Sequence, residues 1–107
     1  MTIFMVETYV IKPKKLAEFT AYKKKISSWK ETHQELFATV KSYRMFARAI
    51  GGTWGGFMEM WEFENLADCE TWMNKIMQSE YPTALQPEFL ASVTPATYSI
   101  TIWNPVE

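Results

Sequence analysis

The chain has 107 residues, with 11 lysine and arginine residues against 12 aspartate and glutamate residues and a formal net charge of -1. This length predicts a single domain, residues 1–107, and the nearly balanced charge argues against a nucleic-acid partner. One cysteine and one histidine cannot form an intrachain disulfide or a zinc cage, so we expect no structural metal. No stretch approaches the roughly 20 apolar residues of a membrane span, and no leader pattern is evident, which predicts a cytoplasmic protein with no membrane partner.

The first half of the chain predicts a strand followed by a long helix. Residues 3–11 are rich in β-branched and aromatic side chains and stop at Pro13, which lacks a donor for a strand ladder. Apolar side chains then recur at three- and four-residue spacing, which predicts a helix over residues 14–39. Four lysines in this segment, at positions 23, 24, 25 and 30, are balanced by Glu31 and Glu35 and are expected to form a solvated helix face.

The second half predicts a hairpin, a second helix and a last strand. Two extended runs, residues 42–50 and 57–63, flank a segment that contains all four glycines of the chain. That segment lacks a Gly-Lys-Ser/Thr phosphate loop, so we expect no nucleotide cofactor. Asn65 predicts the start of a helix that ends near Ser79, and Pro82 and Pro87 bracket a short irregular or helical piece. Residues 96–103 alternate into the last strand.

The predicted order β-α-β-β-α-β, with right-handed crossovers, gives an α+β fold with a four-stranded antiparallel sheet in the spatial order 4-1-3-2. Both helices then pack on one sheet face. The first strand nevertheless carries apolar residues on both faces, with Met5 and Tyr9 on one and Phe4 and Val6 on the other. Because an uncovered apolar face is a liability in a monomer, we expect a homodimer that packs sheet against sheet.

Two segments carry a family resemblance, VETYVIKPKKL at residues 6–16 and MWEFENLAD at residues 60–68. The pattern resembles the NIPSNAP-like branch of the dimeric α/β-barrel superfamily. The resemblance implies a ferredoxin-like protomer whose sheet joins that of a second copy in a barrel. Related proteins include cofactor-independent monooxygenases and isomerases, so the resemblance implies an architecture rather than one activity. Family members commonly have an arginine where this chain has Glu7 and a glycine where it has Lys14.

Two side chains are candidates for acid–base chemistry. Glu7 lies midway along a predicted central strand, where an unpaired carboxylate is costly and its pKa is raised, which fits a general base or a polar anchor in an apolar pocket. The alternatives are an ion pair with Arg44 or Arg48, or a position at the open end of the barrel. His33 lies on the apolar stripe of the first helix and could move protons near neutral pH. The alternative is a histidine at the edge of the core that is hydrogen-bonded to a carbonyl.

Aromatic side chains are unusually abundant, with seven phenylalanines, five tryptophans and five tyrosines. We expect a subset of them, with one more carboxylate, to form a ligand wall between the sheet and the helices. The alternative is ordinary packing in the core and the dimer. The predicted wall consists of Tyr9, Trp29, Tyr43, Glu59, Trp61, Trp72 and Tyr98.

Three functions remain open at this stage. The first is a homodimer that binds a small apolar or aromatic organic molecule between sheet and helices. The second is a cofactor-independent monooxygenase or isomerase that acts on a phenolic or polyketide-like substrate, with Glu7, His33 and a tyrosine moving protons. The third is an interaction module with a solid core. A pocket, and the groups that face it, would separate the three.

Overall fold

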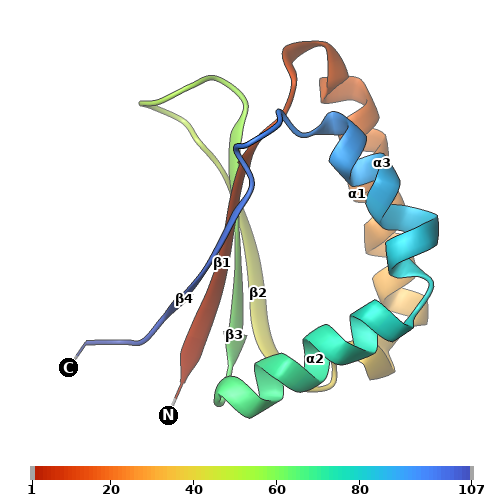
Figure 1. Cartoon of the computed structure of the whole chain (residues 1–107), viewed down its shortest axis with the longest axis vertical. Coiled ribbons are helices and arrows are strands. Elements are labelled where there is room, and N and C mark those ends of the chain that lie inside the picture. The colour runs from red at the N-terminus through yellow and green to blue at the C-terminus, as the bar shows by residue number, and fades with distance from the viewer. Residues whose placement is uncertain (1, 107) are drawn as a thin grey trace.

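The computed structural model describes residues 2–106, which form a four-stranded sheet with helices on one face (Figure 1). The strands are β1 (Ile3–Val10), β2 (Val40–Ala47), β3 (Gly56–Phe63) and β4 (Ser99–Trp103). The helices are α1 (Leu16–Thr32), α2 (Leu66–Gln78) and α3 (Gln86–Ser92), with the 3-10 helices η1 (Pro13–Lys15) and η2 (Gln34–Phe37) and the π-helical turn η3 (Tyr81–Leu85). The strand order is β2-β3-β1-β4 and all pairs are antiparallel, so the predicted α+β fold and strand order are confirmed.

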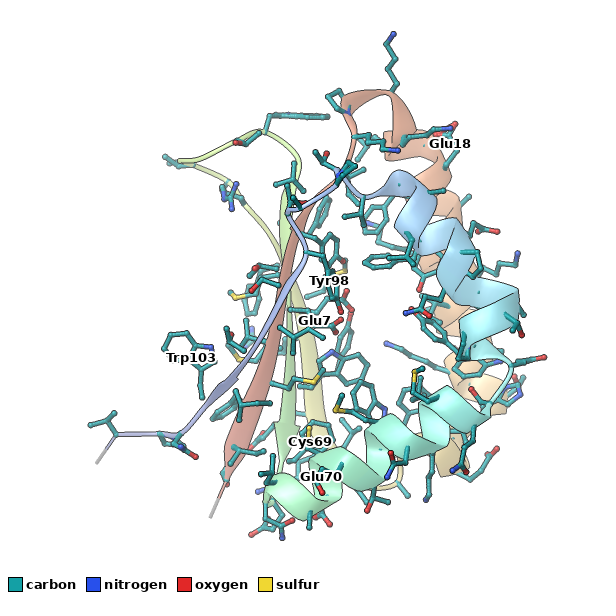
Figure 2. The ribbon with its side chains drawn as sticks, in the orientation of Figure 1. Glu7, Glu18, Cys69, Glu70, Tyr98 and Trp103 are labelled. Carbon is teal, nitrogen blue, oxygen red and sulfur yellow. The ribbon has the colours of Figure 1, made fainter. Side chains whose placement is uncertain are left out.

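The two central strands, β1 and β3, set which residues face the helices. In their register Glu7 lies opposite Glu59 and Met5 opposite Trp61, while β4 places Ile100 opposite Glu7. Since side chains alternate across a strand, these residues share one sheet face. Figure 2 shows Glu7 and Tyr98 directed toward the helices and Trp103 directed away from them.

The helices cover that face from two sides. In Figure 1, α1 and α3 run beside each other along the sheet, and α2 crosses its lower end. One buried cluster lies under α1 and α3, and a second lies under α2. The first cluster consists of Tyr9, Ile11, Phe19, Tyr22, Trp29, Leu85, Phe89 and Val93, and the second of Ile3, Met5, Trp61, Phe63, Cys69 and Trp72.

The first helix is shorter than the sequence predicts. It ends at Thr32 instead of continuing to residue 39, and the 3-10 helix η2 follows. The Thr32 hydroxyl and the imidazole Nδ1 of His33 both lie within hydrogen-bond distance of the Trp29 carbonyl oxygen, at 3.0 Å and 2.8 Å. Hydrogen bonds from side chains to a carbonyl oxygen in the last turn replace backbone hydrogen bonds, which favours the end of α1 at this point. The apolar pattern in the sequence continues beyond Thr32 because Leu36 and Phe37 of η2 also pack against the first buried cluster.

The strand ends also differ from prediction. The strand predicted at residues 42–50 is observed at Val40–Ala47. Its pairing with β3 begins at Val40, with a register shift between Val40 and Ser42, and ends at Ala47, where the hairpin loop leaves the sheet. The last strand begins at Ser99 rather than at residue 96. There the Thr97 hydroxyl accepts a hydrogen bond from the backbone N–H of Val10, in place of a ladder bond.

The second helix begins as predicted. The side chain of Asn65 accepts a hydrogen bond from the backbone N–H of Asp68 at 2.9 Å, the usual arrangement of a helix N-cap. The helix ends at Gln78, and the piece bracketed by the two prolines is helical. None of the helices within residues 2–106 is both long enough and apolar enough to cross a bilayer.

Among residues 2–106, no helix lies on the opposite face of the sheet (Figure 1). Its central part is a shallow, largely apolar depression, and Trp103 at its edge is 59% exposed. The lining residues are Phe4, Val6, Thr8, Met58, Met60, Thr101 and Trp103. These residues alternate along β1, β3 and β4 with the residues that face the helices. The apolar residues on both sides of β1 therefore belong to two surfaces, one under the helices and one on the open face of the sheet.

Candidate functional site

A cavity of about 360 Å³ lies between the sheet and the helices. This volume is within the range of small-molecule sites, and most of the lining is apolar or aromatic. β1, β3, β2 and β4 form its floor, while α1, α2, η3 and α3 supply its walls. A small number of polar groups reach into it, and two of these are carboxylates on neighbouring central strands.

Glu59 is held by two tyrosines. The Tyr9 hydroxyl donates to Oε2 at 2.7 Å, and the Tyr43 hydroxyl donates to Oε1 at 2.6 Å. Burial, with the nearby negative charge of Glu59, raises the pKa of both tyrosines, so their hydroxyls remain protonated donors. The carboxylate therefore fixes the positions of two aromatic rings in the cavity.

Glu7 is held by an indole and a phenol. The Trp61 Nε1–H donates to Oε1 at 2.7 Å, and the Tyr98 hydroxyl donates to Oε2. Neither arginine proposed as a partner reaches it, because Arg48 donates to the Thr53 carbonyl oxygen and Arg44 lies against the Phe46 ring. The ion-pair alternative is therefore wrong for this carboxylate.

The pKa of Glu7 is raised to about 6. Desolvation by burial is the largest cause and repulsion from Glu59 the second, while hydrogen bonds from Tyr98 and Trp61 and the charge of Lys30 act in the opposite direction. A carboxyl group with this pKa exchanges its proton close to neutral pH. The arrangement is therefore a pair of carboxyl groups, one of which can give or take a proton at the floor of an aromatic cavity.

Trp72 supplies an unsatisfied donor at the same site. Its ring lies 4.5 Å from that of Trp61, centroid to centroid, and its side chain is buried. Within residues 2–106 its indole N–H has no hydrogen-bond acceptor. This nitrogen is enclosed by protein atoms, so the unpaired donor is a free-energy cost to the fold and not a contact point for a ligand in the cavity.

The expectation that the lysines of the first helix form a solvated face is wrong for two of them. Lys23 and Lys30 both line the cavity. The signal was present in the sequence, because positions 23 and 30 lie seven residues apart and share the stripe of Phe19, Ile26 and other inward-facing residues of α1. A lysine at such a position can pack its long stem inward and place its amine in the cavity.

His33 is not brought together with Glu7. It does not line the cavity; it follows the last residue of α1, stacks on the Trp29 ring at 4.6 Å and contacts the Trp29 carbonyl oxygen. Its Nε2 lies 3.6 Å from a Glu80 carboxylate oxygen. An acid–base pair of Glu7 and His33 does not fit this geometry, because the helix ends before it can carry His33 inward.

The structure places the remaining predicted site residues around one cavity. All of them are lining residues, contributed by β1, α1, β2, β3, α2 and the segment that leads into β4. They are Glu7, Tyr9, Trp29, Tyr43, Glu59, Trp61, Trp72 and Tyr98. Sequence reasoning missed Lys30 and the inward-facing tyrosines 22 and 81, whose hydroxyls lie 3.0 Å apart. Within residues 2–106 there is no cluster of three or more His, Cys, Asp or Glu side chains that could hold a metal ion.

Solved structures share this fold. A NIPSNAP family protein from Agrobacterium tumefaciens superposes with a TM-score of 0.76 at 17% identity, covering 100% of this chain and 95% of that one. A NIPSNAP domain protein from Burkholderia xenovorans gives 0.73 at 14% identity, covering 99% and 95%. The resemblance predicted from the sequence is thereby confirmed at the level of the fold, which is the ferredoxin-like fold of NIPSNAP proteins.

The same fold occurs in a protein described as a candidate antibiotic biosynthesis monooxygenase from Caulobacter crescentus. Its TM-score is 0.70 at 15% identity, with 99% of this chain and 91% of that one covered. No protein-family model matches the chain, and a search of curated proteins gives no match. At these identities the likeness concerns the fold.

Proposed function

We propose that the chain binds a small apolar or aromatic organic molecule in the cavity between sheet and helices. The observation that carries this proposal is an aromatic cavity of about 360 Å³ with two carboxylates at its floor. Apolar walls supply burial energy and a few fixed polar groups supply orientation, which is the usual composition of a small-molecule site. A solid-core interaction module does not fit a cavity of this size.

The polar groups define the kind of ligand. Each carboxylate oxygen of Glu7 and Glu59 already accepts one hydrogen bond and has a further lone pair, so the floor favours a ligand that donates. A phenol or an aromatic alcohol satisfies this requirement, and an enolisable aromatic ketone satisfies it in its enol form.

Benzyl alcohol is a suitable probe, because it carries an aromatic ring and one hydroxyl group. We expect it to bind the wild-type protein, measured by saturation-transfer NMR, and to bind poorly to Ile26→Trp, which fills the cavity from α1. The matched control is Ile50→Trp in the hairpin loop, where the side chain is 95% exposed. Equal binding to the two variants would refute a site in the cavity.

We propose further that the protein is a homodimer in which the two open sheet faces pack together. This is supported by the apolar depression on that face, which includes Met60 on the central strand β3 and the exposed Trp103. A second copy of the same face is the simplest cover for such a surface. Sedimentation equilibrium should give a dimer at micromolar concentration and a monomer for Met60→Lys, and a soluble wild-type monomer would refute the proposal.

A second candidate function is acid–base catalysis on the bound molecule. The observation that favours it is the pKa of Glu7, which lies at about 6 instead of its ordinary 4.5. One protein of the same fold is described as a candidate antibiotic biosynthesis monooxygenase, which is consistent with this chemistry on this architecture. Glu7 would remove a proton from a carbon whose C–H bond is acidified by conjugation with a carbonyl group, and leave an enolate.

Anthrone, an aromatic ketone with an acidic C–H bond, provides the test. We expect the wild-type protein to accelerate exchange of that hydrogen with deuterium from D₂O, measured by proton NMR, and Glu7→Gln to lose the acceleration. The control Glu70→Gln removes an exposed carboxylate of α2 (Figure 2) and should keep it. Retention of the acceleration in Glu7→Gln would exclude Glu7 as the base.

A further inference from the structure

Lys30 is one of two lysines in the cavity that the proposed function does not use. Its Nζ lies 3.8 Å from the ring centroid of Tyr43 and 4.7 Å from that of Trp61. It lines the cavity and also a shallow groove that opens beside β2. In the described part of the chain, none of the ion pairs or side-chain hydrogen bonds involves this nitrogen. Its amine is therefore held in place by aromatic rings and not bound to an acceptor.

The surroundings shift the amine toward its neutral form. Burial lowers the pKa of Lys30, and this effect outweighs the opposing charges of Glu59 and Glu7. A desolvated lysine in an apolar pocket is the usual setting of an amine nucleophile. The other lysine in the cavity, Lys23, lies 5.4 Å and 5.7 Å from the centroids of the Phe19 and Phe57 rings, so its amine is less closely enclosed by aromatic rings and Lys30 is the better candidate.

We propose that Lys30 is a covalent attachment site, at which its ε-amine forms an imine with the aldehyde or ketone group of an aromatic or apolar ligand. This inference rests on the proposed function, because the cavity must first bind the body of that ligand. Its geometric basis is an amine without an acceptor, fixed between aromatic rings, in the same cavity as two carboxyl groups. Binding beside the amine raises the effective concentration of the carbonyl group.

The reaction needs no oxidant, reductant or cofactor. The lone pair of Nζ attacks the carbonyl carbon, a C–N bond forms, the C–O π bond breaks and a proton moves from nitrogen to oxygen, which gives a carbinolamine. The protonated carboxyl group of Glu7 then donates its proton to the hydroxyl group, which leaves as water as the nitrogen lone pair forms the C=N bond. The carboxylate takes back a proton from nitrogen, so the balance is one amine and one carbonyl compound giving one imine and one water.

Reductive trapping tests the inference in the whole wild-type chain. Benzaldehyde is the probe, and sodium cyanoborohydride converts any imine into a stable benzylamine that peptide mass mapping locates. We expect Lys30 to be labelled about tenfold faster or more than Lys24, an exposed lysine of the same helix. Equal or slower labelling of Lys30 would overturn the inference.

Variants separate the covalent step from ligand binding. Lys30→Arg keeps the positive charge but should abolish the fast labelling, whereas Lys24→Arg should leave it unchanged. Fast labelling that survives in Ile26→Trp would overturn the inference, because the reaction would not need the cavity. If benzyl alcohol, which has no carbonyl group, binds normally but Lys30 is not labelled preferentially, the imine is excluded and the proposed function stands. If benzyl alcohol does not bind the wild type, the proposed function fails in its own assay.

Discussion

Replacing Glu7 by glutamine should stabilise the protein at neutral pH. The amide keeps the shape of the side chain, and it can accept from the Trp61 indole and donate to the Tyr98 oxygen, so the local hydrogen bonds survive. It removes a buried negative charge that lies opposite Glu59. The expected gain comes from relieving the desolvation and repulsion that raise the pKa of this carboxyl group.

The magnitude follows from that pKa. A rise from 4.5 to about 6 corresponds to about 2 kcal/mol, since each pH unit is worth roughly 1.4 kcal/mol. The native state binds the Glu7 proton more tightly than the unfolded state, so wild-type stability falls as the pH rises through the window from 4.5 to 6. Glu7→Gln cannot lose a proton, and its advantage should therefore grow from near zero below pH 4.5 to about 2 kcal/mol above pH 6.

Urea unfolding followed by tryptophan fluorescence measures this difference at matched protein concentration and at pH 4, 5, 6 and 7.5. The control Glu70→Gln removes an exposed charge, and its stability difference from wild type should stay small and nearly constant across these pH values. A Glu7→Gln protein that is less stable than wild type at pH 7.5, with the loss disappearing in acid, would refute the reasoning. Such a result would mean that the charged hydrogen bonds outweigh burial.

Three further substitutions test the fold and the floor of the site by urea unfolding. Asn65→Ala removes the N-cap of α2 and should cost about 1 kcal/mol, whereas an unchanged midpoint would contradict the capping role. Gly55→Ala should lower the free energy of unfolding more than Gly51→Ala. Both glycines have φ near +90°, but a Cβ added at Gly55 would lie 2.9 Å from the Ile11 carbonyl oxygen, so equal losses of stability in the two variants would contradict this steric argument. Tyr9→Phe removes a hydrogen bond to the half-buried carboxylate of Glu59 on β3 and should cost about 2 kcal/mol, and a neutral result would show that this bond contributes nothing net.

Local patterns in the sequence were sufficient for the fold. Strand-forming composition along residues 3–11 and the extended run at residues 57–63 indicated the two central strands, and the Asn65 cap indicated the start of α2, because these signals depend on neighbours along the chain. The strand order followed from the handedness of the crossovers, which is nearly invariant. Side chains two residues apart on a strand share a face, which placed Glu7 and Tyr9 together, so the strand residues of the cavity wall could be predicted from parity.

Tertiary structure decided the partners of the charged groups. Glu7 could be placed on a central strand but not matched to Trp61 and Tyr98, because that match depends on the register of three strands. His33 lies outside the cavity because α1 ends before it, and this end is set by contacts made in the folded chain. Lys30 lies in the cavity because its long side chain packs against aromatic rings from other elements.

The cavity itself could not be predicted from the sequence. The same set of aromatic side chains can fill a core or surround a space, and the outcome depends on how far α1, α2 and α3 stand from the sheet. That separation is a balance of packing among residues far apart in the chain, such as Trp72 on α2 against Trp61 on β3 and Phe89 on α3 against Tyr9 on β1. Composition determined that an aromatic site was possible, and packing in three dimensions determined that the site is open.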